Sequence, residues 1–490
     1  MLQTLKNAWK TKEIRSKIIF TLFILVLYRI GTVIPVPFVN ASSFAGNFGG
    51  TILQYMDTLS GGSLGEATLF ALGVSPYINA SIIIQLLAVV FPRLGELAKE
   101  DKEKMNFITR IVTVVLAIVT AIGYYLLLDQ RGLLANAANP DDNSMAWFYA
   151  IVIVACYVAG ASIIMWLAER INERGIGNGI SIILFANIVS SIPDLVYQLV
   201  NLAVTSYQYN NKAWLFGILT TVFGLIVLAA LFFTVVFIIW VTGSERRIPV
   251  QYAKRVVGRK MYGGQSSNIP LKLNMTGVMP VIFASSIVTL VPTILQLCSV
   301  DPTGKGFWSW LYRFLAQDGV MYPLMLFILI IAFSYFYTQI TFDPVDVANN
   351  LKKQGGAIPG IRQGRPTADY IRKILNKVTL VGALFLSIIA VAPALLGPHA
   401  VQPFLEWVIG AGFEGTLESQ IPASWYYGQL PAAYANWTVA QYQTYITASS
   451  LSGTFTFGGT SILIVVGVAL ETFRELEAQL TMRNYKGFLN

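Results

Sequence analysis

The residue types that usually carry out covalent chemistry are scarce in this chain. Its one histidine, His399, cannot form a histidine-rich metal site by itself. Its two cysteines, Cys156 and Cys298, lack metal-ligand or disulfide-framework spacing, so we interpret them as small buried hydrophobes. The Gly-x-x-x-x-Gly-Lys-Ser/Thr loop that binds nucleotide phosphates is absent from the sequence. These features argue against an enzyme and predict no catalytic residue, no metal site and no cofactor.

Apolar stretches dominate the chain instead. Hydrophobic residues make up 55% of its 490 residues, charged residues only 12%, and the mean hydropathy is +0.61. A helix needs about 20 apolar residues to cross a bilayer. We therefore predict an all-α membrane protein with ten spans, at residues 18–34, 73–92, 107–128, 146–167, 180–200, 213–241, 273–297, 322–342, 378–397 and 457–473.

Ionisable residues lie mostly in the loops and not in the predicted spans. Pumps and ion-coupled transporters usually keep such groups in mid-membrane, so the pathway predicted here is lined by neutral groups. Most of the 34 Lys and Arg residues fall on the side that both termini share, which predicts cytoplasmic termini. Arg29, near the outer end of the first span, can reach the interface or cap an internal carbonyl group.

The connector at residues 36–72 is too long for a turn and too polar for a span. Within it, glycine pairs at 49–50 and 61–62 flank a segment whose apolar residues, including Leu53, Met56 and Leu59, follow helical spacing. This pattern predicts a short helix. Taken alone, it fits either an ordinary surface helix or a helix that swings as a unit about its glycines.

Two predicted cytoplasmic loops, residues 241–272 and 341–377, carry seven Lys or Arg each. Such charges can simply fix membrane orientation. However, loops of this length, with internal glycines and aromatics, also indicate folded protrusions that dock an anionic partner, either nucleic acid or an acidic protein surface. The external stretch 398–456 has no Lys or Arg and many aromatics, which suits either the membrane interface or a small packed cap. Its role is either that of a local structural cap or that of a site for an accessory partner.

Five segments along the chain carry a family resemblance. They resemble, in order, the plug and second span, the entry to the fifth span, the seventh span, the tip of the largest cytoplasmic loop and the start of the last span of the SecY family, the channel subunits of the bacterial Sec translocon. The segments are residues 59–87, 173–182, 274–286, 359–364 and 457–461.

The resemblance implies two pseudo-symmetric five-helix halves around an hourglass pore. The expected organisation is a cytoplasmic segment 1–17, a first half 18–200 with a plug at 51–61, a second half 201–473 and a cytoplasmic tail 474–490. The plug side chains would be those of Leu53, Met56 and Leu59. The basic loops would dock the ribosome and the ATPase SecA through Arg255, Arg259, Lys260 and Arg362, the last at the loop tip.

By the same resemblance, six aliphatic side chains form the constriction of the pore. A ring of this kind closes around an extended peptide yet offers ions nothing that replaces their hydration shell. Leu184 stands where the family commonly has isoleucine, a volume-conserving difference. The ring residues are Val74, Ile78, Ile180, Leu184, Ile282 and Ile464.

A lateral gate is expected between spans two and three on one side and spans seven and eight on the other. Gln85 and Asn274 fall on these gate helices. Their polar side chains either form hydrogen bonds across the closed seam or find hydrogen-bond partners within their own helices.

The function predicted from these features is that of a protein-conducting channel in the bacterial plasma membrane. Unfolded secretory chains with signal sequences would pass through it, and apolar segments would move sideways into membrane lipid. SecA or the ribosome would drive transport, and the small SecE and SecG subunits would accompany the channel. The alternative is a small-solute secondary transporter with inverted repeats. A membrane scaffold without a pathway would leave the glycine-flanked segment unexplained.

Overall fold

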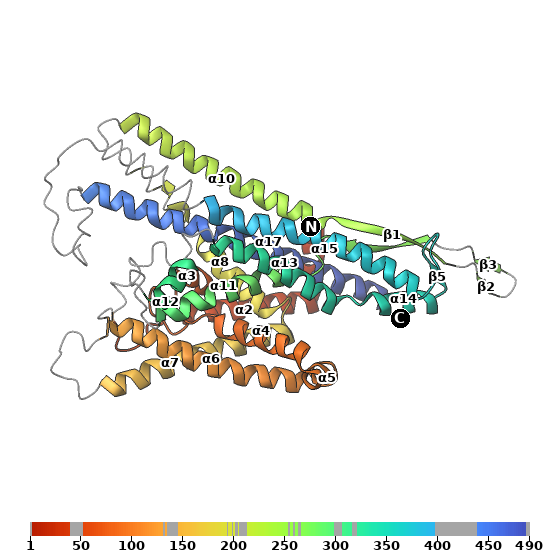
Figure 1. Cartoon of the computed structure of the whole chain (residues 1–490), viewed down its shortest axis with the longest axis horizontal. Coiled ribbons are helices and arrows are strands. Elements are labelled where there is room, and N and C mark those ends of the chain that lie inside the picture. Colours follow the sequence, from red (N-terminus) through yellow and green to blue (C-terminus); the bar gives the residue numbers. More distant parts are fainter. Residues whose placement is uncertain are drawn as a thin grey trace.

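The computed structural model shows a bundle of long helices with a β-hairpin projecting from one end (Figure 1). Both chain ends lie toward that end of the bundle (Figure 1). The structure describes residues 2–39, 52–130, 133–134, 146–193, 195–197, 199–200, 204, 213–252, 255–257, 260–262, 266–297, 306–315, 321–396 and 439–486.

Each of the ten predicted spans overlaps a helix, although α8 ends at Ser190 within the span predicted at 180–200 and α11 begins at Met279 within the span predicted at 273–297. The ten helices are α2 (Lys12–Gly31), α4 (Ser75–Val90), α6 (Lys102–Gln130), α7 (Ala146–Arg174), α8 (Gly179–Ser190), α10 (Ala213–Gly243), α11 (Met279–Leu297), α13 (Met321–Thr341), α15 (Arg365–Leu396) and α17 (Val439–Lys486). In the described part of the chain, six helical stretches are long and apolar enough to cross a membrane, whereas α4 and α11 are shorter apolar helices.

Two predicted spans are parts of much longer helices. The span predicted at 378–397 lies in α15, which begins at Arg365, and the span at 457–473 lies in α17, which extends from Val439 to Lys486. The helix α17 therefore continues into the last part of the external stretch 398–456, and residues 398–438 of that stretch lie outside the described residues.

The shorter elements flank the bundle. They are α1 (Leu2–Lys10), α3 (Ile52–Ser60), α5 (Pro92–Glu100), α12 (Phe307–Phe314) and α14 (Pro344–Lys353), with strands β1 (Glu245–Tyr252), β2 (Arg255–Val257), β3 (Lys260–Tyr262), β4 (Ser266–Lys272) and β5 (Gly356–Ala357). The predicted short helix at the plug position thus exists as α3, and the first basic loop contains strands that the all-α prediction did not include.

Local sequence signals explain where several helices begin. The side chain of Asn178 accepts hydrogen bonds from the backbone N–H groups of Ile180 and Ser181 at the start of α8. Asp343 similarly caps α14 by accepting from Val345 N–H, and Pro344 fits the first turn because its missing N–H has no helical partner there.

The packing is hydrophobic both inside and outside the bundle. One large cluster of buried residues, the central cluster, joins α2, α4, α7, α8, α10, α11, α13, α15 and α17. A second cluster, the α6–α7 cluster, joins those two helices to the connector around residues 64–72. The outer face of α10 leaves Phe232, Phe233 and Trp240 about 70% exposed, as suits contact with lipid chains.

Candidate functional site

The six predicted ring residues come together in the central cluster. Five of them are at most 4% exposed and belong to the cluster, and Ile180 packs against it; the five are Val74, Ile78, Leu184, Ile282 and Ile464. They are supplied by the start of α4 and by α8, α11 and α17. All six side chains are aliphatic, so they provide no oxygen atoms that could coordinate an ion.

Close helix packing supports the ring at the entry to α11. Gly467 of α17 lies so near Val278 that a Cβ at position 467 would overlap the valine side chain. Val278 directly precedes α11, and Ile282 follows one turn later. The small residue therefore lets the backbones of α17 and the α11 entry approach closely, a feature common at membrane helix interfaces.

The short helix α3 lies against both clusters. Leu59 packs on the central cluster, and Met56 packs on the α6–α7 cluster. The Thr293 hydroxyl of α11 approaches the Met56 sulfur at 3.6 Å. Leu53 is in α3, but its side chain is outside the described part of the structure. The helix contacts α8, α11 and α17, three of the elements that supply the ring.

A glycine-terminated turn ends α3. The backbone N–H of Gly62 donates to the carbonyl of Asp57, and that of Gly61 donates to the carbonyl of Thr58, the pattern of a Schellman motif. Gly61 has φ +71°, a conformation that side-chain-bearing residues rarely adopt. The Asp57 carboxylate also accepts from Gly65 N–H at 2.8 Å, which ties the helix to the following segment.

Side chains from α2 and α8 bind the carbonyl end of α3. The Asn187 amide of α8 donates to the Leu59 carbonyl at 2.7 Å and to the Tyr28 hydroxyl at 2.9 Å. The Arg29 guanidinium donates to the Gly61 carbonyl at 3.3 Å. Arg29 therefore caps an internal carbonyl group, which is one of the two roles that the sequence left open for it. Sequence reasoning did not select Asn187, although an amide inside an apolar span is a detectable signal.

The predicted gate residues lie in different surroundings. Gln85 of α4 accepts a hydrogen bond from the Tyr337 hydroxyl of α13 at 2.6 Å, and its amide donates to Ser81 in its own helix at 2.9 Å. Asn274 lies in the bend between β4 and α11, not on the helix itself. It is 8% exposed, and its Oδ1 has no hydrogen-bond partner among the described residues. The structure thus brings Gln85 together with Tyr337, which sequence reasoning missed.

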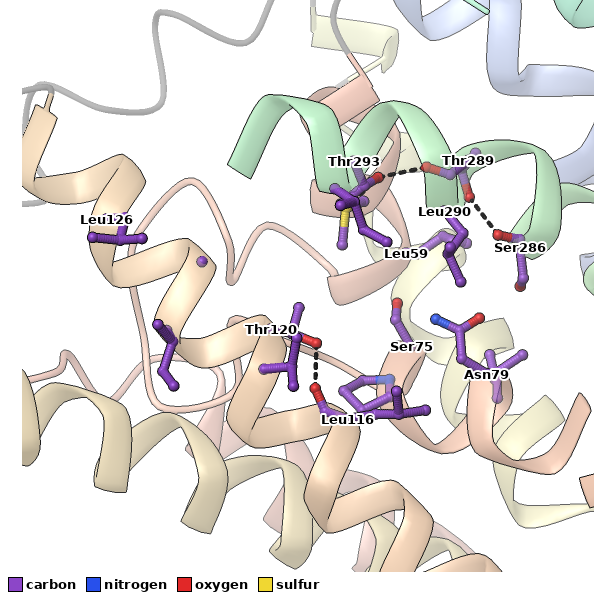
Figure 2. A pocket seen from close by; sticks show the side chains of 17 residues that line it. Leu59, Ser75, Asn79, Leu116, Thr120, Leu126, Ser286, Thr289, Leu290 and Thr293 are labelled. Atoms are coloured by element: carbon purple, nitrogen blue, oxygen red, sulfur yellow. Dashed lines mark hydrogen bonds between the residues drawn. The ribbon is translucent and has the colours of Figure 1, made fainter. Parts of the chain in front are cut away.

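A cavity of about 300 Å³ lies between α4, α6, α11 and α3. Ser75 and Asn79 on α4 face Ser286 and Leu290 on α11 across it (Figure 2). Leu59 of α3 also lines this space. The cavity is mostly apolar with a few polar groups, and it is located where the two sides of the predicted gate meet.

The basic loops fold into one protrusion. Strand β1 pairs with both β4 and β5, so the two loops share a three-stranded antiparallel sheet. A cluster that includes Ile248, Val250 and Leu351 packs this sheet against α14 and α15. Partial burial and, to a smaller extent, the nearby Arg474 lower the pKa of Lys272 at the base of the sheet.

The predicted docking residues that the structure describes lie outside this three-stranded sheet, in the separate β2–β3 pair and in the turn before α15. Arg362 is exposed in the turn before α15, and its carbonyl accepts from the Thr367 hydroxyl at 2.7 Å. Arg255 begins β2 and Lys260 begins β3, whereas Arg259 lies outside the described residues. Among the residues that the structure places, no group of three or more His, Cys, Asp or Glu could hold a metal ion.

Comparison with known proteins agrees with the resemblance. The family model described as SecY matches residues 68–416. A protein translocase subunit SecY of Streptomyces galbus is 38% identical over 506 residues, and one of Mycobacterium bovis is 39% identical over 504 residues. In both comparisons all of this chain and all of the relative are covered.

Solved structures share the fold. The structure of a protein-conducting channel matches with a TM-score of 0.58 at 16% identity, covering 95% of this chain and 92% of that one. Sec61 in a canine ribosome–channel complex from the endoplasmic reticulum matches with a TM-score of 0.55 at 15% identity and the same coverage. A SecY structure whose plug is described as stabilising the closed channel matches equally well.

The helical bundle and these relatives define a protein translocation channel. The predicted all-α channel fold is confirmed, with the β-sheet of the basic loops as an addition. The chain belongs to the SecY family.

Proposed function

We propose that the translocating polypeptide crosses the membrane through the ring of six aliphatic side chains, and that α3 is the plug that covers this ring. The observation that carries the proposal is the meeting of side chains from α4, α8, α11 and α17 in one cluster with α3 packed on it. An unfolded chain can displace aliphatic groups at low cost, whereas a hydrated ion gains no substitute for its water shell there.

The lateral gate lies, on this proposal, between α4 and α6 on one side and α11 and α13 on the other. Two observations support a closed gate on this proposal: α11 contacts α4 and α6, and the Tyr337 hydroxyl is bonded to Gln85. A hydrogen bond between membrane helices stabilises by about 0.6–1.7 kcal/mol. An apolar signal helix that inserts at the cavity of Figure 2 can offset the loss of this hydrogen bond, because burying its own apolar side chains is favourable.

The channel is a passive conduit in this proposal, and a partner supplies the energy. The protrusion of the two basic loops, which carries Arg255 on β2, Lys260 on β3 and Arg362 in the turn before α15, is the docking surface for SecA and the ribosome. A solved relative is a ribosome–channel complex, which supports the ribosome as a partner. SecE and SecG are the expected companion subunits, and signal-bearing chains and membrane lipid are the expected contacts of the open gate.

The expected location is the bacterial plasma membrane with both termini in the cytoplasm. The charge asymmetry of the loops supports this orientation. A small-solute transporter is the weaker alternative because the buried polar side chains in the described part of the chain are Thr, Ser and Asn, with no carboxylate or ammonium group.

Substitution in the ring tests the proposal. Ile78→Ser places a hydroxyl in the constriction, so hydrated ions should cross the resting channel more easily. We expect the ion conductance of reconstituted channels without substrate to rise several-fold, while Ile151→Ser on the lipid-facing surface of α7, which is 59% exposed, leaves the conductance at the parent value. Equal conductance in the two variants would argue against this ring.

A further inference from the structure

We propose that Asn187 is a positioning residue that holds the plug in the closed channel and thereby sets how strictly the channel requires a signal sequence. The Asn187 amide and the Arg29 guanidinium bind two carbonyl groups at the end of α3, and we name these two contacts the plug clamp. The inference rests on the proposed role of α3 as the plug.

The chemistry of a helix end explains why these contacts matter. The last four carbonyl groups of a helix have no partner within it, and Leu59 supplies one of them in α3. Asn187 donates to the Leu59 carbonyl, and Arg29 donates to the next free carbonyl, that of Gly61. The positive charge of Arg29 also stabilises the negative end of the helix dipole. The clamp therefore binds backbone atoms of α3. It does so next to the glycines at 61–62, about which the helix would swing.

The surroundings of Asn187 fix its amide in the donating orientation. Asn187 is 0% exposed, and its second amide hydrogen goes to the Tyr28 hydroxyl of α2. Its Oδ1 is buried without a hydrogen-bond partner among the described residues. A buried, unsatisfied acceptor costs free energy in the closed state, and this cost is relieved when the plug leaves and water enters. This cost reduces the net stabilisation that the clamp gives to the closed state.

Gly61 permits the close approach that the clamp needs. A Cβ at this position would lie 2.8 Å from Nη1 of Arg29 and 2.9 Å from Oδ1 of Asn187. The φ of +71° also disfavours any other residue. The glycine therefore fits between the two clamping side chains.

The test compares Asn187→Leu with Ser387→Ala in channels reconstituted with their companion subunits. Leucine has the same number and branching of side-chain heavy atoms as asparagine but no hydrogen-bond donor. Ser387 is also 0% exposed, yet its hydroxyl bonds only within its own helix, to the Leu384 carbonyl. Translocation is measured for one secretory protein with and without its signal sequence.

We expect Asn187→Leu to raise transport of the signal-less chain relative to the signal-bearing chain by about 3- to 20-fold, the range of a single hydrogen bond between membrane helices. Ser387→Ala should keep the parent ratio. Arg29→Gln, which weakens the other half of the clamp, should shift the ratio in the same direction. A ratio that stays at the parent value in both Asn187→Leu and Arg29→Gln would overturn the proposal, and a general loss of folding would lower both rates without raising their ratio.

A second measurement separates failure of the clamp from failure of the plug assignment. Met56→Cys is placed in a background without Cys156 and Cys298, and its modification by a charged thiol reagent is timed. If α3 is the plug, a stalled substrate accelerates modification in the parent. Asn187→Leu should then accelerate it without substrate. Acceleration by substrate but not by Asn187→Leu would contradict the clamp alone, whereas no acceleration by substrate would contradict the plug.

Discussion

At the residue scale, the hydrogen bond between Tyr337 and Gln85 is the direct polar link across the predicted gate. It joins residues 252 positions apart at 2.6 Å. Gln85 is half-buried, so its amide would lose this partner on opening unless a substrate or water replaced it. If the gate lies where we propose, its closed state depends on this specific contact as well as on apolar packing.

Removing the Tyr337 hydroxyl should make the gate easier to open. For Tyr337→Phe we expect a shift toward the open gate of about 3- to 20-fold, because one bond between membrane helices is lost. Weakly hydrophobic signal sequences, which normally fail, should then be exported, and a graded series of signal sequences measures the change.

Tyr335→Phe is the matched control for this substitution. Its hydroxyl lies on the same helix but donates to the Asn376 carbonyl of α15 and not to the gate. Gln85→Leu combined with Tyr337→Phe should add little to either change alone. Equal effects of the two tyrosine substitutions would mean that Tyr337 does not act through the gate.

At the element scale, the basic loops form a sheet because their strands alternate. In β1, Ile248 and Val250 point into the protrusion and their neighbours are exposed, the period of two that a strand requires. This pattern is present in the sequence, but it is short and lies among charges, so only a folded protrusion was predicted. The pairing of β1 with β5 joins two loops far apart in sequence, and no local signal shows it.

Charge reversal on this protrusion should weaken partner docking. Arg362→Glu replaces an exposed cation on the proposed docking surface with an anion, so the affinities for ribosomes and for SecA should fall several-fold and depend less steeply on salt. Arg93→Glu, the same change on α5, should bind like the parent. Sedimentation with ribosomes and titration with SecA measure both affinities, and unchanged binding by Arg362→Glu to both partners would remove Arg362 from the docking surface.

At the scale of the whole molecule, hydropathy located the spans but not the ends of the helices. The pattern shows only the apolar part of a helix, whereas α15 and α17 continue into polar sequence beyond the membrane. The ring was predictable only through family resemblance, because buried aliphatic residues look alike in any membrane helix. Contacts such as Asn187 with Leu59, 128 residues apart, depend on tertiary packing and required the structure.

The central claim is that a polypeptide passes through the ring, and a photo-crosslinking residue at Ile282 tests it most directly. Ile282 is 4% exposed inside the central cluster, so a crosslinker there meets a substrate only if the substrate enters the constriction. With signal-bearing chains stalled at increasing lengths, we predict adducts whose position moves steadily along the substrate. No adducts at Ile282, with bound motor and intact substrate docking, would contradict a polypeptide pathway through this ring.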